Sequence, residues 1–129
     1  MKSVVRISDG LIPEDKPVQL QSGILRRMIH PDNGTPLSVA VSLLIMNPGD
    51  EVAPHYHKHR EEVYYILSGE GVAVHRNTEG EEEIKLEKNI AIPIPKNMIH
   101  DIKCTGEEPL WILVIMSPPL PVDDSYRAD

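Results

Sequence analysis

Three histidines and one glutamate, spread over two short blocks of the sequence, have side chains that could bind a metal ion. The first block, PHYHKHREEVYYILSGEG, contains His55, His57 and Glu62, and the second, NIAIPIPKNMIHDIKC, contains His100. Because residues two apart in an extended strand project from the same face, His55 and His57 could hold one ion together. Imidazole suits zinc, copper, iron and nickel, and a carboxylate adds a harder oxygen ligand. The two blocks therefore predict a mononuclear metal site built on β-strands.

The carboxylate of such a site has two candidates, Glu61 and Glu62, which are adjacent in the sequence. In a strand they must point to opposite faces, so only one of them can face the metal. If Glu62 is that residue, Tyr64 and Ile66 share its inner face, and Glu61 faces solvent or the rim. The strand pattern alone leaves both choices open.

Most of the chain alternates between short apolar stretches and turn-forming residues. Nine stretches are rich in β-branched or aromatic residues, or alternate in polarity as strands do: VVRI, ILRRMI, VAVSLLIM, VYYIL, VAVHR, EIKL, NIAIPI, DIKC and WILVIM. Segments such as HPDNGTP, MNPGDEVAP and CTGEEP separate them and favour chain reversals. No stretch has a sustained helical stripe. The pattern predicts an all-β sandwich or barrel with little helix.

The length of 129 residues fits one domain with a modest core. We expect a single domain over residues 1–129, with its core at about 37–117. Residues 1–23 are expected to form an N-terminal arm or strands. Residues 117–129 are rich in Pro and Asp, so we expect a poor strand there, an arm or a frayed end without a catalytic role.

The composition argues against nucleic-acid and membrane partners. The formal net charge is −7, and no basic stripe is present that could displace counterions from phosphates. The apolar stretches are too short to cross a bilayer, and MKSVVRISDG lacks the apolar segment of a signal peptide. The single cysteine, Cys104, excludes an internal disulfide. We therefore expect a cytoplasmic protein that binds a small molecule.

Both blocks resemble the two sequence motifs of the cupins. The first block and its approach carry five residues at the spacing of the first cupin motif: Gly49, His55, His57, Glu62 and Gly69. The second block resembles the second motif, with Pro95 followed five residues later by His100. Only 19 residues, 70–88, separate the blocks. A spacer this short resembles small single-domain cupins of the conserved-barrel type.

The resemblance implies a double-stranded β-helix, the cupin jelly-roll barrel, with N-terminal strands and a proline-rich C-terminal arm. It also implies one divalent transition metal per chain (Mn, Fe, Ni, Zn or Co) and selects Glu62 as the carboxylate ligand. The implied ligand set is His55, His57, Glu62 and His100. Small cupins commonly pair, so we expect a homodimer that uses the apolar run 111–116 and the N-terminal strands.

The second block departs from the family pattern at three positions. Asn89 and Asn97 stand where the family usually has Gly, and Cys104 stands where it often has Asn. Asn tolerates the left-handed conformation better than other non-glycine residues, so the turn at Asn97 can survive. Cys104 is expected to be a small buried strand residue.

His59 continues the alternation of His55 and His57 and is therefore a tempting further ligand. The chain must turn between His57 and Glu62, so the strand register is lost there. We expect His59 to be exposed or to lie beside the ligands without binding the metal.

The candidate catalytic residues are Tyr64 and His75. Tyr64 is the expected inward polar neighbour of the metal. His75 lies in the strand-like VAVHR, where a histidine is more often satisfied by structural hydrogen bonds. Arg26 and Arg27 are further possible partners for an anion.

An ion held by three neutral imidazoles and one carboxylate keeps a net positive charge and leaves positions for water, dioxygen or a chelating substrate. Cupins of similar layout include dioxygenases, oxalate-degrading enzymes, sugar isomerases and lyases. We expect a metal-dependent enzyme (dioxygenase, decarboxylase, lyase or isomerase) that acts on a small oxygen-rich metabolite such as a carboxylate or sugar derivative. The alternative is a non-catalytic cupin that binds or senses a metal or small ligand, since fold and site type do not fix activity.

Overall fold

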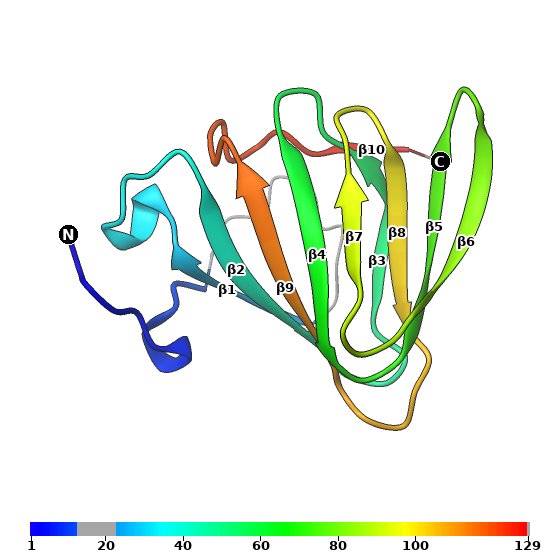
Figure 1. Cartoon of the computed structure of the whole chain (residues 1–129), viewed down its shortest axis with the longest axis horizontal. Coiled ribbons are helices and arrows are strands. Elements are labelled where there is room, and N and C mark those ends of the chain that lie inside the picture. The colour runs from blue at the N-terminus through cyan, green and yellow to red at the C-terminus, as the bar shows by residue number, and fades with distance from the viewer. Residues whose placement is uncertain (13–22, 129) are drawn as a thin grey trace.

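Two antiparallel β-sheets face each other in the computed structural model, which describes residues 1–12 and 23–128 (Figure 1). The strands are β1 (Ile24–Ile29), β2 (Ala40–Met46), β3 (Glu51–Tyr56), β4 (Glu61–Ser68), β5 (Gly71–Asn77), β6 (Gly80–Leu86), β7 (Ala91–Ile94), β8 (Ile99–Cys104), β9 (Leu110–Ser117) and β10 (Tyr126–Arg127). Two 3-10 turns accompany them, η1 (Ile7–Asp9) and η2 (Pro31–Asn33). Over the described ranges, no helix is long and apolar enough to cross a membrane.

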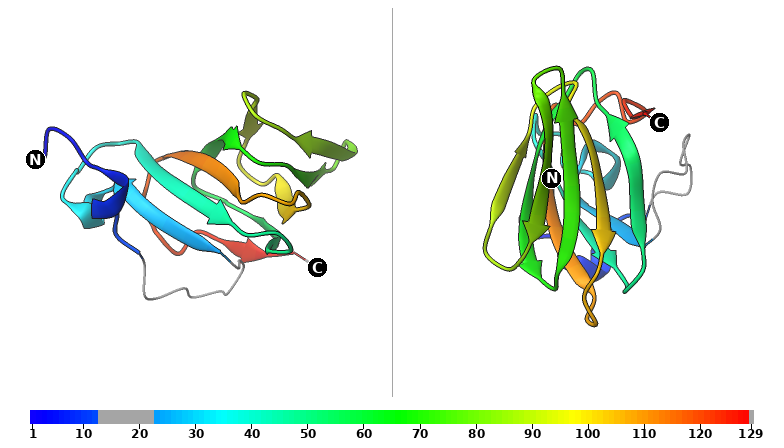
Figure 2. Two further views of the ribbon diagram at one scale, coloured as in Figure 1. Left: turned by 90° about the horizontal axis from the view of Figure 1, so that it is seen from below. Right: turned by 90° about the vertical axis from the view of Figure 1, so that its right-hand side faces the viewer.

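The chain passes back and forth between the two sheets. Sheet A has the strand order β1-β2-β9-β4-β7, and sheet B has the order β10-β3-β8-β5-β6. Consecutive strands such as β2, β3 and β4 therefore belong to alternate sheets, and the turned views of Figure 2 show the two layers around a shared interior. This arrangement confirms the predicted all-β jelly roll.

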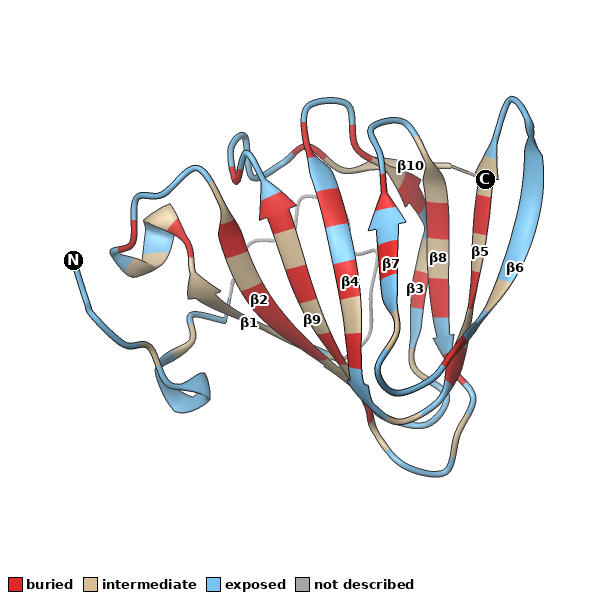
Figure 3. Cartoon of the chain, in the orientation of Figure 1, coloured by how far each residue is buried: buried red, intermediate tan, exposed pale blue. Residues whose placement is uncertain are grey.

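The interior is built by alternation along the strands. Buried and more exposed residues alternate along β4 and β9, which run side by side in sheet A (Figure 3). Ile66 and Ile112 of sheet A and Ile102 of sheet B are each 0% exposed and belong to one hydrophobic cluster. Burying a side chain of this size contributes about 1.5–3 kcal/mol, so the cluster holds the sheets face to face.

Two strand predictions were wrong. VVRI, residues 4–7, is not a strand: Val4 is 71% exposed, and Ile7 begins η1. In the part of the chain that the structure describes, this stretch pairs with no strand, so its β-branched residues build no ladder. EVAP, which we assigned to a turn, forms most of β3, because the turn closed by the Asp50 N–H and the Asn47 carbonyl ends before Glu51.

Residues 117–129, where we expected a poor strand, an arm or a frayed end, contain one two-residue strand after Ser117 among the described residues. Tyr126 and Arg127 form β10, which pairs with Tyr56 and His55 of β3. Edge strands carry unpaired N–H and C=O groups, and β3 satisfies those of its outer edge with β10. Residue 129, and residues 13–22 of the predicted N-terminal arm, lie outside the described residues.

The Gly69→Ala substitution is expected to destabilise the fold more than Gly49→Ala does. Both glycines have a positive φ, +87° and +89°, so alanine is strained at either position by about 1–2 kcal/mol. An added Cβ at Gly69 would also collide with the carbonyl oxygen of Pro109, whereas one at Gly49 would meet nothing within 4 Å. Urea denaturation should show that the free energy of unfolding of Gly69→Ala is about 1–3 kcal/mol lower than that of Gly49→Ala. Equal losses would mean that the backbone at Pro109 moves aside without cost.

Candidate metal centre

Three imidazoles lie next to one another across sheet B. His55 on β3 pairs with His100 on β8, and His100 pairs in turn with His75 on β5. Directly opposite residues of an antiparallel pair share a face, so the three rings face the interior together. His57 follows the end of β3 by one residue, and its ring centroid lies 5.0 Å from that of His55 and 5.1 Å from that of His100.

His55, His57 and His100 form a compact buried triad. Each offers a ring nitrogen, and these nitrogens lie within 4.8 Å of one another. The three residues are 5%, 2% and 0% exposed. A register irregularity between Val52 and His55 interrupts the pairing of β3 with β8, and such a bulge can re-aim the side chains that follow it. The triad could hold a metal ion.

The outer nitrogen of each ring is held by a backbone carbonyl. The Nδ1 atoms lie at hydrogen-bond distance from these oxygens: His55 from Ala53 at 2.8 Å, His57 from Asp124 at 2.6 Å and His100 from Met98 at 2.9 Å. A carbonyl oxygen only accepts, so each Nδ1 must carry the proton and donate it. Each neutral ring therefore keeps its lone pair on Nε2, the tautomer that a metal ligand needs.

Glu62 approaches the triad from the opposite sheet. It lies on β4 and is 5% exposed, while its neighbour Glu61 is exposed. Its Oε1 atom is 3.1 Å from Nε2 of His57 and 3.7 Å from Nε2 of His100. Nitrogen and oxygen ligands that share one ion at about 2.0–2.2 Å lie roughly 3 Å apart when they are adjacent. These two spacings fit an ion shared with His57 and His100, although Glu62 is not among the ligand atoms that all lie within 4.8 Å of one another.

The inner nitrogens of His57 and His100 are buried without a hydrogen-bond partner among the described residues. With Nδ1 protonated, each Nε2 directs a lone pair toward the electron-rich carboxylate of Glu62. These atoms repel one another in a dry interior unless a metal ion lies between them or an Nε2 takes up a proton and donates it to Glu62. The donor set thus fits a divalent cation.

Arg60 is a charged neighbour that the sequence reasoning missed. It is only 8% exposed, and its Nε atom lies 3.3 Å from Oε2 of Glu62. Burial alone would raise the pKa of Glu62, but the ring nitrogens of His100 and His57 beside its carboxylate and the charge of Arg60 hold it well below its usual range. Residues two apart in an extended segment share a face, so the position of Arg60 two residues before Glu62 could have identified it as an inward neighbour.

Two further pKa values are set by burial. Burial, followed by the nearby His100, lowers the pKa of His55 from 6.5 to about 3, so His55 stays neutral at pH 7. Burial, followed by the charge of Glu62, raises the pKa of Tyr64 well above its usual range. Tyr64 is 5% exposed, as its predicted inward position requires, and its protonated hydroxyl is a hydrogen-bond donor.

The other predicted candidates lie at different distances from the triad. The ring of His75 is centred 6.2 Å from that of His100, and its Nε2 is buried with no hydrogen-bond partner in the described chain. The expected structural hydrogen bond at that atom is therefore missing. His59 is exposed, as we expected. Arg27 pairs with Asp32 at 3.2 Å instead of reaching the triad.

The second block keeps its geometry despite the departures from the family pattern. Asn89 and Asn97 adopt φ of 69° and 68°, the left-handed conformation that we predicted Asn could supply. The N–H of Asn97 donates to the carbonyl of His57 at 2.7 Å, so this turn braces the first block. Cys104 is buried at the end of β8, as expected.

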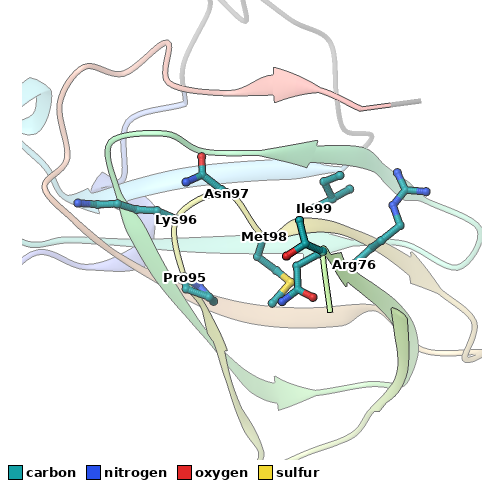
Figure 4. Close-up of a pocket in the computed structure, with 8 residues that line it drawn as sticks. Arg76, Pro95, Lys96, Asn97, Met98 and Ile99 are labelled. Atoms are coloured by element: carbon teal, nitrogen blue, oxygen red, sulfur yellow. The ribbon is translucent and has the colours of Figure 1, made fainter. Parts of the chain in front are cut away.

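A pocket of about 470 Å³ lies between the β5–β6 turn and the β7–β8 loop (Figure 4). It is lined by Arg76, Asn77, Thr78, Pro95, Lys96, Asn97, Met98 and Ile99. Met98 lies in the middle of the labelled residues, whereas the Lys96 side chain extends away from them. Arg76 and Ile99 lie opposite each other in the paired strands, directly beside the His75–His100 pair, so their side chains project from the other face of sheet B.

Comparison with known proteins identifies the sequence family. Residues 42–116 match the family model described as "Cupin domain". An uncharacterized protein of Methanocaldococcus jannaschii is 32% identical over 111 residues, which are 85% of this chain and 86% of that protein. A protein of Streptomyces cyaneus named polyketide synthase CurC is 28% identical over 110 residues, 85% of this chain and 69% of that protein.

The fold matches solved structures as well. The crystal structure of a predicted oxalate decarboxylase from Thermotoga maritima superposes with a TM-score of 0.72 at 21% identity. The match covers 89% of this chain and 98% of that one. At this identity the likeness shows a shared fold.

The stability of the metal-free protein is expected to fall below pH 6.5. The folded pKa of His55, about 3, lies below its ordinary value of 6.5, so between these values the unfolded state binds a proton that the folded state excludes. The free energy of unfolding therefore decreases as the pH falls, by up to about 1.4 kcal/mol per pH unit from this group. Urea denaturation of chelator-treated protein at several pH values from 7 to 4 measures this pH dependence of the free energy of unfolding. His55→Gln should reduce the slope and His59→Gln should leave it unchanged; identical slopes in both variants would contradict the assignment.

Proposed function

The chain belongs to the cupin family, and from this premise we propose that it is a metal-dependent enzyme acting on a small oxygen-rich metabolite. The proposed ligands of one divalent transition metal are His55, His57, Glu62 and His100. Manganese, iron, nickel, zinc and cobalt all accept this mixture of imidazole and carboxylate.

The observation that carries the proposal is the pair of unpartnered Nε2 atoms. Those of His57 and His100 are buried, and a Glu62 oxygen lies 3.1 Å and 3.7 Å from them. Leaving a buried polar atom unpaired costs about 1–3 kcal/mol, and two such atoms beside a carboxylate add repulsion. A bound cation removes both costs.

The charge of the centre favours an oxygen-rich ligand. Three neutral imidazoles and one carboxylate leave a divalent ion with a net charge of about +1, which attracts carboxylate, enediol or phenolate oxygens. When bound, the metal would act as a Lewis acid or activate dioxygen beside the substrate. The relative named as a polyketide synthase supports an enzyme.

Two inward polar side chains are the proposed contacts of the substrate. Tyr64 lies on β4 two residues after Glu62, and its raised pKa keeps the hydroxyl protonated, so it can donate a hydrogen bond to an anionic oxygen. His75 has an unpartnered Nε2 and a pKa that burial and His100 lower, so its neutral ring can accept a proton. A neutral imidazole with an unpartnered ring nitrogen can act as a general base.

A non-catalytic cupin that binds or senses a metal or small ligand is the second candidate. It is favoured by one observation, the depth of the centre: the four proposed ligands are at most 5% exposed. A metal closed off from substrate would serve stability or sensing instead of turnover.

Protein purified without chelators is expected to contain one equivalent of a divalent transition metal. His57→Ala should lose the stoichiometric metal, because His57 belongs to the triad, whereas His59→Ala should keep it, because His59 is exposed. Plasma mass spectrometry of both variants measures the content. Equal loss in the two variants would contradict the ligand assignment.

Activity then separates the two functions. Metal-loaded protein is mixed with small carboxylates, enediols and phenols while dioxygen uptake and carbon dioxide release are followed. Turnover that falls about 10²-fold in Tyr64→Phe at unchanged metal content supports the enzyme. Tight binding of one of these compounds without turnover would support the sensing module instead.

We also propose a homodimer that forms through the outer face of sheet A. Apart from Glu61 and Ser117 at one end, the outward residues of the paired part of β4 and β9 are largely apolar, and Val63 pairs with Ile115 while Tyr65 pairs with Leu113. Val63 is 37% exposed and Leu67 is 36% exposed. A contiguous apolar sheet face of this kind is typical of a surface that a partner covers.

Light scattering at micromolar concentration should give twice the chain mass for the wild type. Val63→Glu places a charge on the apolar face and should yield monomers. Val72→Glu, on the outer face of sheet B, is the matched control and should remain dimeric. A monomeric wild type would disprove the dimer, and dissociation of both variants would place the interface elsewhere.

A further inference from the structure

The C-terminal segment 118–128 connects the two sheets across the rim of the barrel. It leaves β9 of sheet A after Ser117 and ends as β10 on β3 of sheet B (Figure 1). The last described contact is a hydrogen bond from the N–H of Ala128 to the carbonyl of Pro54 at 2.9 Å. The segment therefore lies against the strand that carries His55.

Asp124 anchors this segment to the first metal-binding block. The residue is 1% exposed, and its carboxylate accepts hydrogen bonds from the backbone N–H groups of Lys58 and His59 at 3.1 Å and 2.7 Å. Its own carbonyl accepts the Nδ1 proton of His57 at 2.6 Å. One residue thus clamps the loop after β3 and sets the ring of a proposed ligand.

Ser125 contacts Arg60, the positively charged neighbour of Glu62. Its hydroxyl accepts from the Arg60 guanidinium at 3.4 Å and lies 3.4 Å from Nδ1 of His57. Arg60 in turn lies 3.3 Å from Glu62. The segment therefore touches the neighbours of two proposed ligands that come from different sheets.

Aromatic contacts hold the end of the segment from outside. The ring of Tyr126 stacks on that of Tyr56 with centroids 5.5 Å apart, and the Lys58 ammonium lies 4.3 Å from the Tyr126 centroid. Stacking and cation–π contacts thus add to the hydrogen bonds of Asp124 in holding this segment on β3.

The three imidazoles differ in how their outer nitrogens are held. His55 and His100 each use a carbonyl two residues earlier in the chain, whereas His57 uses one 67 residues further along the chain. Only the ring of His57 is oriented by a separate segment of the described chain. If that segment undocks, His57 loses the acceptor that fixes its tautomer.

We propose that segment 118–128 is a positioning element of the metal centre, and that its docking through Asp124 and metal binding at His57 strengthen each other. The inference rests on the metal site proposed above. Coupling of two equilibria is reciprocal, so a docked segment raises metal affinity by the same factor by which the metal stabilises docking. Removal of a group that orients a ligand typically lowers metal affinity 10–100-fold.

The test compares Asp124→Ala with Asp123→Ala in the full chain. Asp123 is the exposed neighbour, so it serves as the matched control. Co²⁺ is titrated into each protein while its absorption bands report affinity and ligand geometry. We expect 10–100-fold weaker binding and altered bands in Asp124→Ala, less than 2-fold change in Asp123→Ala, and partial recovery in Asp124→Asn, which keeps one carbonyl acceptor.

Amide hydrogen exchange distinguishes coupling to the metal from a purely structural role of Asp124, because only coupling makes exchange in the segment depend on Co²⁺. In the wild type, Co²⁺ should slow exchange of the amides of residues 124–128 by a factor similar to the loss of affinity in Asp124→Ala. Unchanged Co²⁺ affinity in Asp124→Ala, or equal protection of the segment with and without Co²⁺, would overturn the coupling alone. A wild type that binds no Co²⁺ would overturn both the coupling and the proposed metal site.

Discussion

The structure depends on a buried carboxylate that faces the lone pairs of imidazoles. Glu62 reaches the triad from the sheet opposite, and its Oε1 lies 3.1 Å from Nε2 of His57. Without a positive charge between them, these atoms would repel one another across the interior between the two sheets. Arg60 supplies one positive charge on the far oxygen of Glu62, and a metal would supply the other on the near oxygen. The electrostatics of the interior therefore favour a positive charge at the place where the two sheets meet, and a divalent cation would supply it.

Strand register makes this arrangement possible. Direct pairing of His55 with His100 and of His100 with His75 lines up imidazoles from three strands that are far apart in sequence. The apolar cluster behind them, which includes Ile66 and Ile102, fixes the spacing between the sheets, and close-packed interiors resist small changes of such spacing. Packing that stabilises the barrel thus also sets the distance over which Glu62 faces the triad.

Short-range patterns were sufficient to predict the fold and much of the centre. The alternation of β4 placed Tyr64 and Ile66 on the inner face, and the tolerance of Asn97 for a positive φ was predicted from its side chain. The strand β3 was partly missed, because the Pro and Gly of its neighbourhood signal turns. The role of Asp124 could not be predicted from the sequence. It depends on hydrogen bonds to residues 65–67 positions away, and no local sequence pattern encodes such contacts.

The use of backbone carbonyls as acceptors has a consequence for how this centre tolerates genetic change. Ala53 and Met98 orient His55 and His100 through main-chain oxygens, which every amino acid possesses. Codons 53 and 98 can therefore drift among residues compatible with the local backbone without erasing an acceptor. Codon 124 has no such freedom, since the side chain of Asp124 is what keeps its own carbonyl in place. Mutational robustness is thus distributed unevenly around three chemically equivalent rings.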